Sequence, residues 1–429
     1  MILKSEALTL RQGKVKEALN LCGQMPKSAR PSAALSALCG LALLDGGEFE
    51  KARQKFEAAC QANPECPEAK LGLGELEMSR LRWPQALPWL RQAQTTKLLL
   101  FRAVTALSRC LQELGQRQEA LSLLRQLEKS AGSLNKREIE GLKQRIGYLE
   151  ALARLGQADV YGLDHVAPKT QLSFTSHDGH ILIPVTLNGL RVKCHVDTGN
   201  NGGLAIDQKT AAALKIEAVA EEKTAGVEGK SVEKIGLIDE LRIGDSTISH
   251  VPVSLVDSCL GGAAEANLGL AILRRFNLSI DYKNKQFVLY RLSLAPDQPS
   301  LEAKAAAVIP FWVRPLIIIR AKINGGPEIP CILDTGAGIP VLHVEYYYEL
   351  LPKGVKPAVM PGGKKGLPYL LVTLELNGLT FRNVFSVVLD LSSIYETGSF
   401  YIPVIVGASV LQNSVIHFDF KNMELAIGR

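Results

Sequence analysis

The sequence predicts a multidomain α plus β protein, in which an N-terminal α-helical solenoid is followed by two duplicated all-β lobes. Three observations support this prediction. Small residues recur every 34 positions in the first 157 residues, and the word Asp-Thr-Gly occurs twice, 137 positions apart. Landmarks downstream of each Asp-Thr-Gly keep nearly the same offset. A period of about 20 to 50 residues is the signature of stacked repeats. The much longer offset indicates that one β-rich unit has been duplicated.

The composition is that of an ordinary globular protein, with 429 residues, 47% apolar and 21% charged. This length gives room for two or three domains. The net charge of +6 arises within the first 165 residues and forms no basic stripe with aromatics, so no nucleic-acid partner is expected. No stretch approaches the ~20 apolar residues of a membrane span. No basic and then apolar leader is visible, which favours a cytoplasmic location, or an exported one if a leader was removed.

Residues 1–157 are predicted to form helical repeats. The recurring small residues are Ala18, Ala52, Ala86 and Ala120, with Gly13, Gly47 and Gly115 at a second position where Leu81 is the exception. Alanines let paired helices pack closely, and glycines allow the turn between them. The pattern resembles the tetratricopeptide (TPR) repeat, whose period is about 34 residues. The resemblance implies about four repeats and a capping helix near Lys136–Leu155.

The resemblance also implies a concave groove for a protein partner or a substrate peptide, because arrays of this kind usually bind such ligands. The alternative is a helical spacer that covers the β-rich lobes or sets their distance from something else. No sequence feature names a partner. Residues 158–170 follow the array and are expected to be a linker.

The two lobes are predicted over 171–293 and 308–429, joined by a Pro- and Ala-rich linker over 294–307. In each lobe an apolar strand leads through Asn-Gly into a second apolar strand that ends on Asp197 or Asp334. Asn-Gly between apolar runs is a strong hairpin signal, because both residues accept positive φ. Each lobe therefore begins with a hairpin that carries an aspartate at its end.

The correspondence continues downstream. Leu268-Gly269 matches Val406-Gly407, and the segment 277–284 matches 414–422. A near-constant offset over several landmarks makes a chance origin of both Asp-Thr-Gly words very improbable.

Asp-Thr-Gly after a hairpin, a glycine-rich segment some thirty residues later and an apolar-apolar-Gly near the end resemble the retropepsin-like aspartic proteases. Bacterial aspartyl proteases of this type are the nearest comparison. The resemblance covers residues 171–429 and implies a pseudo-two-fold acid protease, in which each lobe supplies one catalytic aspartate. It implies a monomer that contains both halves of the site as an intramolecular pseudo-dimer.

The chemistry that this family performs needs two carboxylates about 3 Å apart. One carboxylate is ionised and acts as the general base on a water, while the other is protonated and hydrogen-bonds the substrate carbonyl. Two like charges at that distance cannot both ionise easily, so the pair retains a proton. We assign both roles jointly to Asp197 and Asp334, and the sequence does not distinguish them. The reaction requires no cofactor and no metal.

The resemblance assigns supporting roles to the residues after each aspartate. The hydroxyls of Thr198 and Thr335 are expected to cross-link the two loops. Gly199 and Gly336 are expected to leave room for backbone amides to approach the carboxylates. The loops continue into Asn200 and Ala337. Flexible flap hairpins are expected in each lobe at four glycines: Gly226, Gly229, Gly362 and Gly363.

The first lobe departs from the family pattern at two positions. Asn200 stands where Ala or Ser is usual, and Asn267 stands where an apolar residue is usual. We expect the departure at Asn200 to alter hydrogen bonding at Asp197 and the pH range of the pair. The weaker match of the first lobe, including Asn267, is expected to affect efficiency more than the fold. His195 shares the side of its strand with Asp197, and we interpret it as a packed or solvent-facing residue.

The eight cysteines form no Cys-x-x-Cys, and no histidine pair has metal-ligand spacing, so the sequence does not support a zinc site. Several cysteines stand where a small apolar residue would serve, which favours free thiols and a reducing compartment. A bridge between Cys60 and Cys66 is the alternative.

The sequence thus predicts an aspartic endopeptidase that binds extended peptides with apolar side chains near the cut. Two alternatives remain open. The first is a pseudoprotease that binds peptides without cleaving them. The second is a scaffold whose main function lies in the helical array.

Overall fold

The computed structural model describes residues 2–24, 31–130, 132, 134–153, 159–226, 229–292, 305–351, 358–359 and 366–428. The chain forms two compact units. The first comprises Met1–Gln157, Glu221–Ser231 and Ser392–Ile402, and the second comprises Ala158–Ala220, Val232–Leu391 and Pro403–Arg429. No helix among the described residues has both the length and the apolar character needed to cross a membrane.

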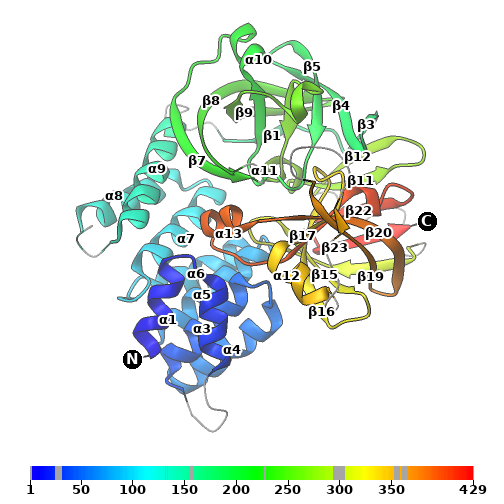
Figure 1. Ribbon diagram of the computed structural model, residues 1–429. Coiled ribbons are helices and arrows are strands. Elements are labelled where there is room, and N and C mark those ends of the chain that lie inside the picture. Colours follow the sequence, from blue (N-terminus) through cyan, green and yellow to red (C-terminus); the bar gives the residue numbers. More distant parts are fainter. Residues whose placement is uncertain are drawn as a thin grey trace. The chain divides into compact units, whose positions relative to one another are not determined.

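The first unit is built from stacked helices, coloured blue to cyan in Figure 1. Its helices are α1 (Ile2–Arg11), α2 (Val15–Gly23), α3 (Ala33–Asp45), α4 (Phe49–Ala62), α5 (Pro67–Ser79), α6 (Trp83–Ala93), α7 (Leu100–Glu113), α8 (Arg117–Lys129), α9 (Lys136–Ala153) and α13 (Ser392–Gly398). The first eight form four helix pairs, and α9 packs on α8. The predicted helical solenoid, with its four repeats and final helix, is confirmed.

The 34-residue period marks the turns and contacts of these pairs. Gly13, Gly47 and Gly115 have φ of 72°, 75° and 77° in the turns between paired helices, and Leu81 has φ of 57° in the remaining turn, between α5 and α6. The exception in the glycine series therefore adopts the same left-handed backbone as the glycines. The four alanines that recur every 34 positions are completely buried, which explains why a small residue recurs there.

Close packing of α3 and α5 around Phe56 leads to a first prediction. A Cβ added at Gly72 would overlap the buried Phe56 ring, whereas a Cβ at Gly147 in α9 would meet nothing within 4 Å. Overpacking of a core costs about 1 to 3 kcal/mol, so Gly72→Ala should lower the free energy of unfolding by that amount. The matched control Gly147→Ala should raise it by up to about 1 kcal/mol, because alanine is the better helix former. Denaturant unfolding of the full chain measures both, and equal effects would contradict this packing.

Cys22 on α2 and Cys39 on α3 form a disulfide, with Cα atoms 5.6 Å apart. The expectation of free thiols is therefore wrong for these two residues. Cys60 and Cys66 are both free, so the alternative bridge between them is also wrong. The pairing depends on the contact between neighbouring helices, which brings together residues 17 positions apart.

Glu6 on α1 is completely buried beside this disulfide, with Oε1 3.3 Å from the Cys22 sulfur and Oε2 without a hydrogen-bond partner in the described structure. Burial raises the pKa of Glu6 from 4.5 to about 7. The folded state therefore binds this proton more tightly than the unfolded state does. The resulting stabilisation is complete below about pH 4.5 and is lost as pH rises through about 7.

Glu6→Gln should remove this pH dependence. The thermal midpoint of the wild type should fall between pH 5 and pH 8 by more than that of the variant, since the shift corresponds to on the order of 3 kcal/mol. Glu17→Gln, at an exposed side chain of α2, is the control and should behave like wild type. Parallel pH curves for wild type and Glu6→Gln would contradict the buried-carboxyl account.

The segment Ser392–Ile402 packs within the helical unit. The Tyr401 N–H donates to the Asp45 carbonyl at 3.0 Å, and Arg137 donates to the Ser399 hydroxyl at 2.8 Å. The ammonium of Lys16 lies over the Tyr401 ring, 5.4 Å from its centroid. Part of the array surface is therefore covered by a segment of the same chain.

The second unit contains most of the two β-rich lobes. The first lobe forms a nine-stranded sheet in which β8 also pairs with β9. Its strands are β1 (Gly162–His165), β3 (Thr175–His177), β4 (His180–Leu187), β5 (Leu190–Val196), β6 (Leu204–Asp207), β7 (Ala220–Gly226), β8 (Gly229–Ile243), β9 (Ser246–Val256) and β10 (Ala266–Leu268), with helices α10 (Gln208–Ala213) and α11 (Leu270–Leu273).

The second lobe forms an eight-stranded sheet in which β15 also pairs with β19. Its strands are β14 (Trp312–Val313), β15 (Ile317–Ile323), β16 (Glu328–Asp334), β17 (Val341–His343), β18 (Ala358–Val359), β19 (Pro368–Leu376), β20 (Leu379–Leu389) and β21 (Val404–Gly407), with helix α12 (Val344–Leu350).

The two lobes share one topology, as a duplication requires. In the first, β5 pairs in parallel with β10, β10 antiparallel with β6, and β6 in parallel with β9. In the second, β16, β21, β17 and β20 pair in the same order and with the same directions. The Asn-Gly turns precede β5 and β16 as expected, with φ of 42° and 87° at Asn188 and Gly189, and 52° and 72° at Asn324 and Gly325.

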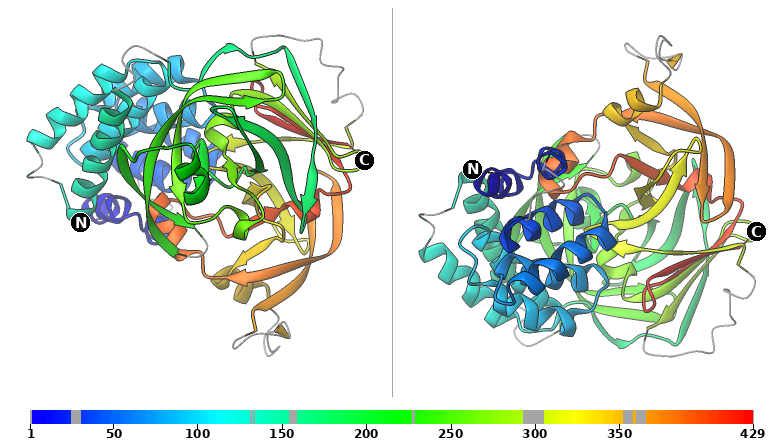
Figure 2. Two further views of the ribbon diagram at one scale, coloured as in Figure 1. Left: turned by 90° about the horizontal axis from the view of Figure 1, so that it is seen from above. Right: turned by 90° about the horizontal axis from the view of Figure 1, so that it is seen from below.

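A six-stranded sheet joins the lobes, and Figure 2 shows its strands from both lobes side by side. Its strands are β13 (Ala307–Pro310), β23 (Glu424–Gly428), β22 (Val415–Asp419), β11 (Phe276–Asp281), β12 (Gln286–Arg291) and β2 (Lys169–Ser173). The central strands β11 and β22 pair antiparallel, with Ser279 opposite His417. Hydrogen bonds across this sheet therefore hold the two lobes together.

The predicted linkers differ from the structure. Residues 158–170 contain β1, which pairs with β9, and the first two residues of β2. This segment is thus largely part of the sheets, because β1 and β2 pair with β9 and β12, which are distant in the sequence. Most of the linker predicted over 294–307 lies outside the described residues, and Ala307 already begins β13.

Candidate active site

The two Asp-Thr-Gly words meet at the interface of the lobes. Asp197 directly follows β5, and Asp334 is the last residue of β16. The two carboxyl groups are joined by a side-chain hydrogen bond. Burial, followed by the charge of Asp197, raises the pKa of Asp334 well above its usual value. The structure therefore brings together the two predicted aspartates in a geometry that retains a proton.

Backbone amides hold one oxygen of each carboxyl group in the same way. Asp197 Oδ1 accepts hydrogen bonds from the N–H groups of Gly199 and Asn200, at 2.8 and 3.1 Å. Asp334 Oδ1 accepts them from Gly336 and Ala337, at 2.7 and 3.2 Å. Hydrogen bonds donated to a carboxylate favour its ionised form. These contacts hold Oδ1 of each aspartate in the same way, so any difference between the two carboxyl groups lies at Oδ2.

The two glycines have a further role that the sequence did not indicate. A Cβ on Gly199 would collide with the carboxyl of Asp334, and a Cβ on Gly336 would collide with that of Asp197. Each glycine therefore gives space to the carboxyl of the opposite lobe, in addition to allowing the approach of backbone amides.

The threonines cross-link the loops as the resemblance implied. Thr198 Oγ1 donates to the Leu333 carbonyl at 3.1 Å and accepts from the Thr335 N–H at 2.9 Å. Thr335 Oγ1 donates to the Val196 carbonyl at 3.1 Å and accepts from the Thr198 N–H at 3.1 Å. Both side chains are inaccessible to solvent, at 0% and 1% exposure. Each hydroxyl thus connects the backbones of both lobes.

A group of polar side chains lies beside Asp197. Asn267 Nδ2 donates to Asp197 Oδ2 at 2.8 Å and lies 3.4 Å from His195 Nδ1. The ring centroids of His195 and His180 are 5.0 Å apart. Burial lowers the pKa of His195 to about 4 and also lowers that of His180. Both imidazoles are therefore neutral near pH 7.

The sequence pointed to parts of this group only. His195 is packed, with 2% of its surface exposed, which agrees with the packed alternative of the two given for it. The sequence marks Asn267 as a departure from the family pattern but assigns it no contact. His180 was missed. The signal for it would have been the register of the β4/β5 hairpin, in which Leu182 pairs with His195 and places His180 beyond that pair.

The structure describes two of the four glycines predicted to lie in flaps. Gly226 ends β7 and Gly229 begins β8, so these two glycines lie at the end of a hairpin in the first lobe. Gly362 and Gly363 lie outside the described residues.

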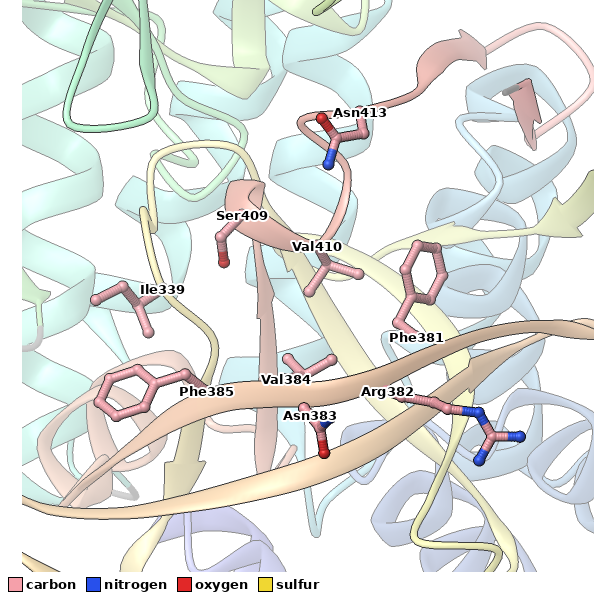
Figure 3. Close-up of a pocket in the computed structure, with 9 residues that line it drawn as sticks. All are labelled: Ile339, Phe381, Arg382, Asn383, Val384, Phe385, Ser409, Val410 and Asn413. Carbon is pink, nitrogen blue, oxygen red and sulfur yellow. The ribbon is translucent and has the colours of Figure 1, made fainter.

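The second lobe has an open pocket of about 410 Å³ next to the loop that follows Asp334 (Figure 3). A bulge in β20 places Arg382 and Asn383 opposite one residue of β19, and Asn383 has φ of 54°. In Figure 3, Phe381 and Val384 extend from β20 toward the segment that carries Val410. The pocket is lined by Ile339, Phe381, Arg382, Asn383, Val384, Phe385, Ser409, Val410 and Asn413.

Comparisons with known proteins identify two regions of the chain. Residues 183–272 match the family model described as aspartyl protease, and residues 40–97 match that of the tetratricopeptide repeat. No curated protein matches the chain. Among solved structures, the aspartic proteinase from Irpex lacteus is 13% identical, with a TM-score of 0.43, over 61% of this chain and 97% of that one. One segment of the chain is therefore similar to aspartyl proteases and another to tetratricopeptide repeats.

Proposed function

We propose that the chain is an aspartic endopeptidase of the retropepsin-like type, in which Asp197 and Asp334 form one catalytic pair. The main support is the hydrogen-bonded carboxyl pair, contributed by two copies of one motif and held by the reciprocal threonine contacts. It supports the two requirements of the reaction, because carboxyl groups in contact share a proton and the threonine contacts hold the two loops together.

In the proposed reaction, a water between the carboxyls loses a proton to the ionised one and attacks the carbonyl carbon of a peptide bond. The protonated carboxyl donates its proton to the carbonyl oxygen. The tetrahedral intermediate then collapses: one of its hydroxyl groups returns a proton to the pair as the carbonyl re-forms, the C–N bond breaks, and the amine nitrogen takes a proton from the pair. No covalent bond forms between enzyme and substrate, and the pair returns to its starting protonation state.

The substrate is proposed to be an extended peptide within a protein chain, with apolar side chains near the cut. Ile339 supports this proposal, since it follows the Asp334 loop, is 42% exposed and lines the pocket in Figure 3. Both aspartates come from one chain, and we propose a monomer that acts as a pseudo-dimer. The TPR region is proposed to recruit a substrate or partner on surfaces that Ser392–Ile402 leaves uncovered.

The test is cleavage of a diverse peptide library from pH 3 to pH 8, with products identified by mass spectrometry. Cleavage by wild type that is absent from Asp197→Asn and Asp334→Asn supports the proposal. Equal cleavage by all three proteins would assign the activity to a contaminant or another site. Peptide binding without cleavage at any pH would favour the pseudoprotease.

A further inference from the structure

We propose that Asn267 is a positioning residue that holds Asp197 in its ionised form, which makes Asp197 the general base and Asp334 the general acid. This inference rests on the proposed function and divides the two roles that the duplicated motif leaves equivalent. The observation that carries it is an asymmetry between the lobes around two otherwise similar carboxyl groups.

A chain of hydrogen bonds fixes the orientation of the Asn267 amide. The Gly202 N–H can only donate, and it donates to Asn200 Oδ1 at 2.8 Å. The Asn200 NH₂ group therefore faces Asn267, and it donates to Asn267 Oδ1 at 3.0 Å. The Asn267 NH₂ group is consequently directed at Asp197 Oδ2, 2.8 Å away. A backbone amide thus determines that Asp197 receives a donor at this position.

The donor favours the charged form of Asp197. An amide N–H stabilises a carboxylate, which accepts hydrogen bonds, more than it stabilises a protonated oxygen. With two backbone N–H groups on Oδ1 and Asn267 on Oδ2, Asp197 accepts hydrogen bonds from three nitrogen donors. Asp334 accepts from two, and its remaining hydrogen bond is to Asp197.

Among the described residues of the second lobe, the matching strand positions carry no counterpart to this polar group. Asn267 on β10 pairs with His195 on β5, whereas the corresponding pair of β21 and β16 is Ile405 with Ile332. Ala337 takes the place of Asn200. Asp197 therefore accepts one more nitrogen donor than Asp334, so the shared proton is more stable on Asp334.

The other titratable groups near Asp197 do not supply a competing positive charge. Asp197 acts electrostatically on His195 of β5 and on His180 at the start of β4, and burial lowers the pKa of both histidines. Asp178 and His177 act on His180 with opposite effects on its pKa. Near neutral pH the charge of Asp197 is thus held by hydrogen-bond donors, with the proton of the pair on Asp334.

The test measures ionisation directly, with full-length protein carrying ¹³C at the aspartate carboxyl carbons and NMR titration from pH 3 to pH 8. Asp197→Asn and Asp334→Asn assign the two signals. In wild type, Asp197 should ionise first. Asn267→Leu should move the first ionisation of the pair about one pH unit higher, because a hydrogen bond to a charged group is lost.

Asn277→Leu is the matched control, because the Asn277 side-chain amide also donates to a buried aspartate, Asp419, at 3.1 Å. It should leave the titration of the pair unchanged. A folded Asn267→Leu with unchanged titration, or a wild type in which Asp334 ionises first, would overturn the proposal. If Asn267→Leu does not fold, Asn200→Ala replaces it. That variant frees the Asn267 amide and should give a smaller shift in the same direction, and no shift would overturn the proposal.

The activity of the same variants separates this inference from the proposed function. In Asn267→Leu the acid limb of the pH profile of kcat/KM should move upward by about the same unit. If wild type cleaves nothing, the proposed function fails, while the carboxyl titration still decides which aspartate is ionised. A loss of kcat/KM without a shift of the profile would indicate a structural role for Asn267 only.

Discussion

Replacing either aspartate should abolish peptide cleavage. Asp334→Asn cannot supply the proton, and Asp197→Asn cannot accept one, so each should lower kcat/KM by about 10⁴-fold or more. The two residues act as a unit, so the double variant should be no less active than either single one. Steady-state cleavage of one peptide from the library measures all three.

Asp207→Asn is the control for this series. Asp207 Oδ1 accepts the Thr210 N–H at 2.7 Å at the start of α10, and asparagine caps a helix about as well as aspartate. Its kcat/KM should equal that of wild type. Substantial activity in either Asp197→Asn or Asp334→Asn would show that the pair is not the catalytic centre.

Removing one threonine hydroxyl should weaken the connection between the lobes. Thr335→Val keeps the shape of the side chain but leaves the buried N–H of Thr198 and the Val196 carbonyl without their partners. An unsatisfied buried group costs about 1 to 3 kcal/mol, so the free energy of unfolding should fall by about 2 to 4 kcal/mol. Activity should fall at least about tenfold, because small displacements of catalytic groups are costly.

Thr335→Ser keeps the hydroxyl and should retain most of both stability and activity. Denaturant unfolding and peptide cleavage of the two variants measure this difference. Wild-type stability in Thr335→Val would contradict the role assigned to the reciprocal contacts.

The local motifs were predictable because their physical requirements lie within a few residues. Asn188-Gly189 required positive φ and formed the expected turn, and the alanines of the 34-residue period became fully buried contacts. The two Asp-Thr-Gly words occupy matching strand ends because the same short sequence folds in the same way twice. The duplicated topology follows from the constant offset.

The rest depended on pairings between distant segments. Asn267 reaches Asp197 across 70 positions, and only the parallel pairing of β10 with β5 places it there. The Cys22–Cys39 disulfide depends on the packing of α2 against α3. β1 lies in a segment that the sequence predicts to be a linker. Its strand is not evident from the local sequence because its partner β9 is far along the chain. The spacing of residues in the sequence does not predict these contacts.

The central claim is that the two aspartates of one chain act as a single site. The most direct test mixes purified Asp197→Asn and Asp334→Asn and assays peptide cleavage over a range of concentrations, with wild type as the reference. Because each chain carries both halves of its own site, the mixture should be as inactive as either variant alone. Recovery of activity that rises with concentration would contradict the claim, since the active pair would then be assembled from two chains.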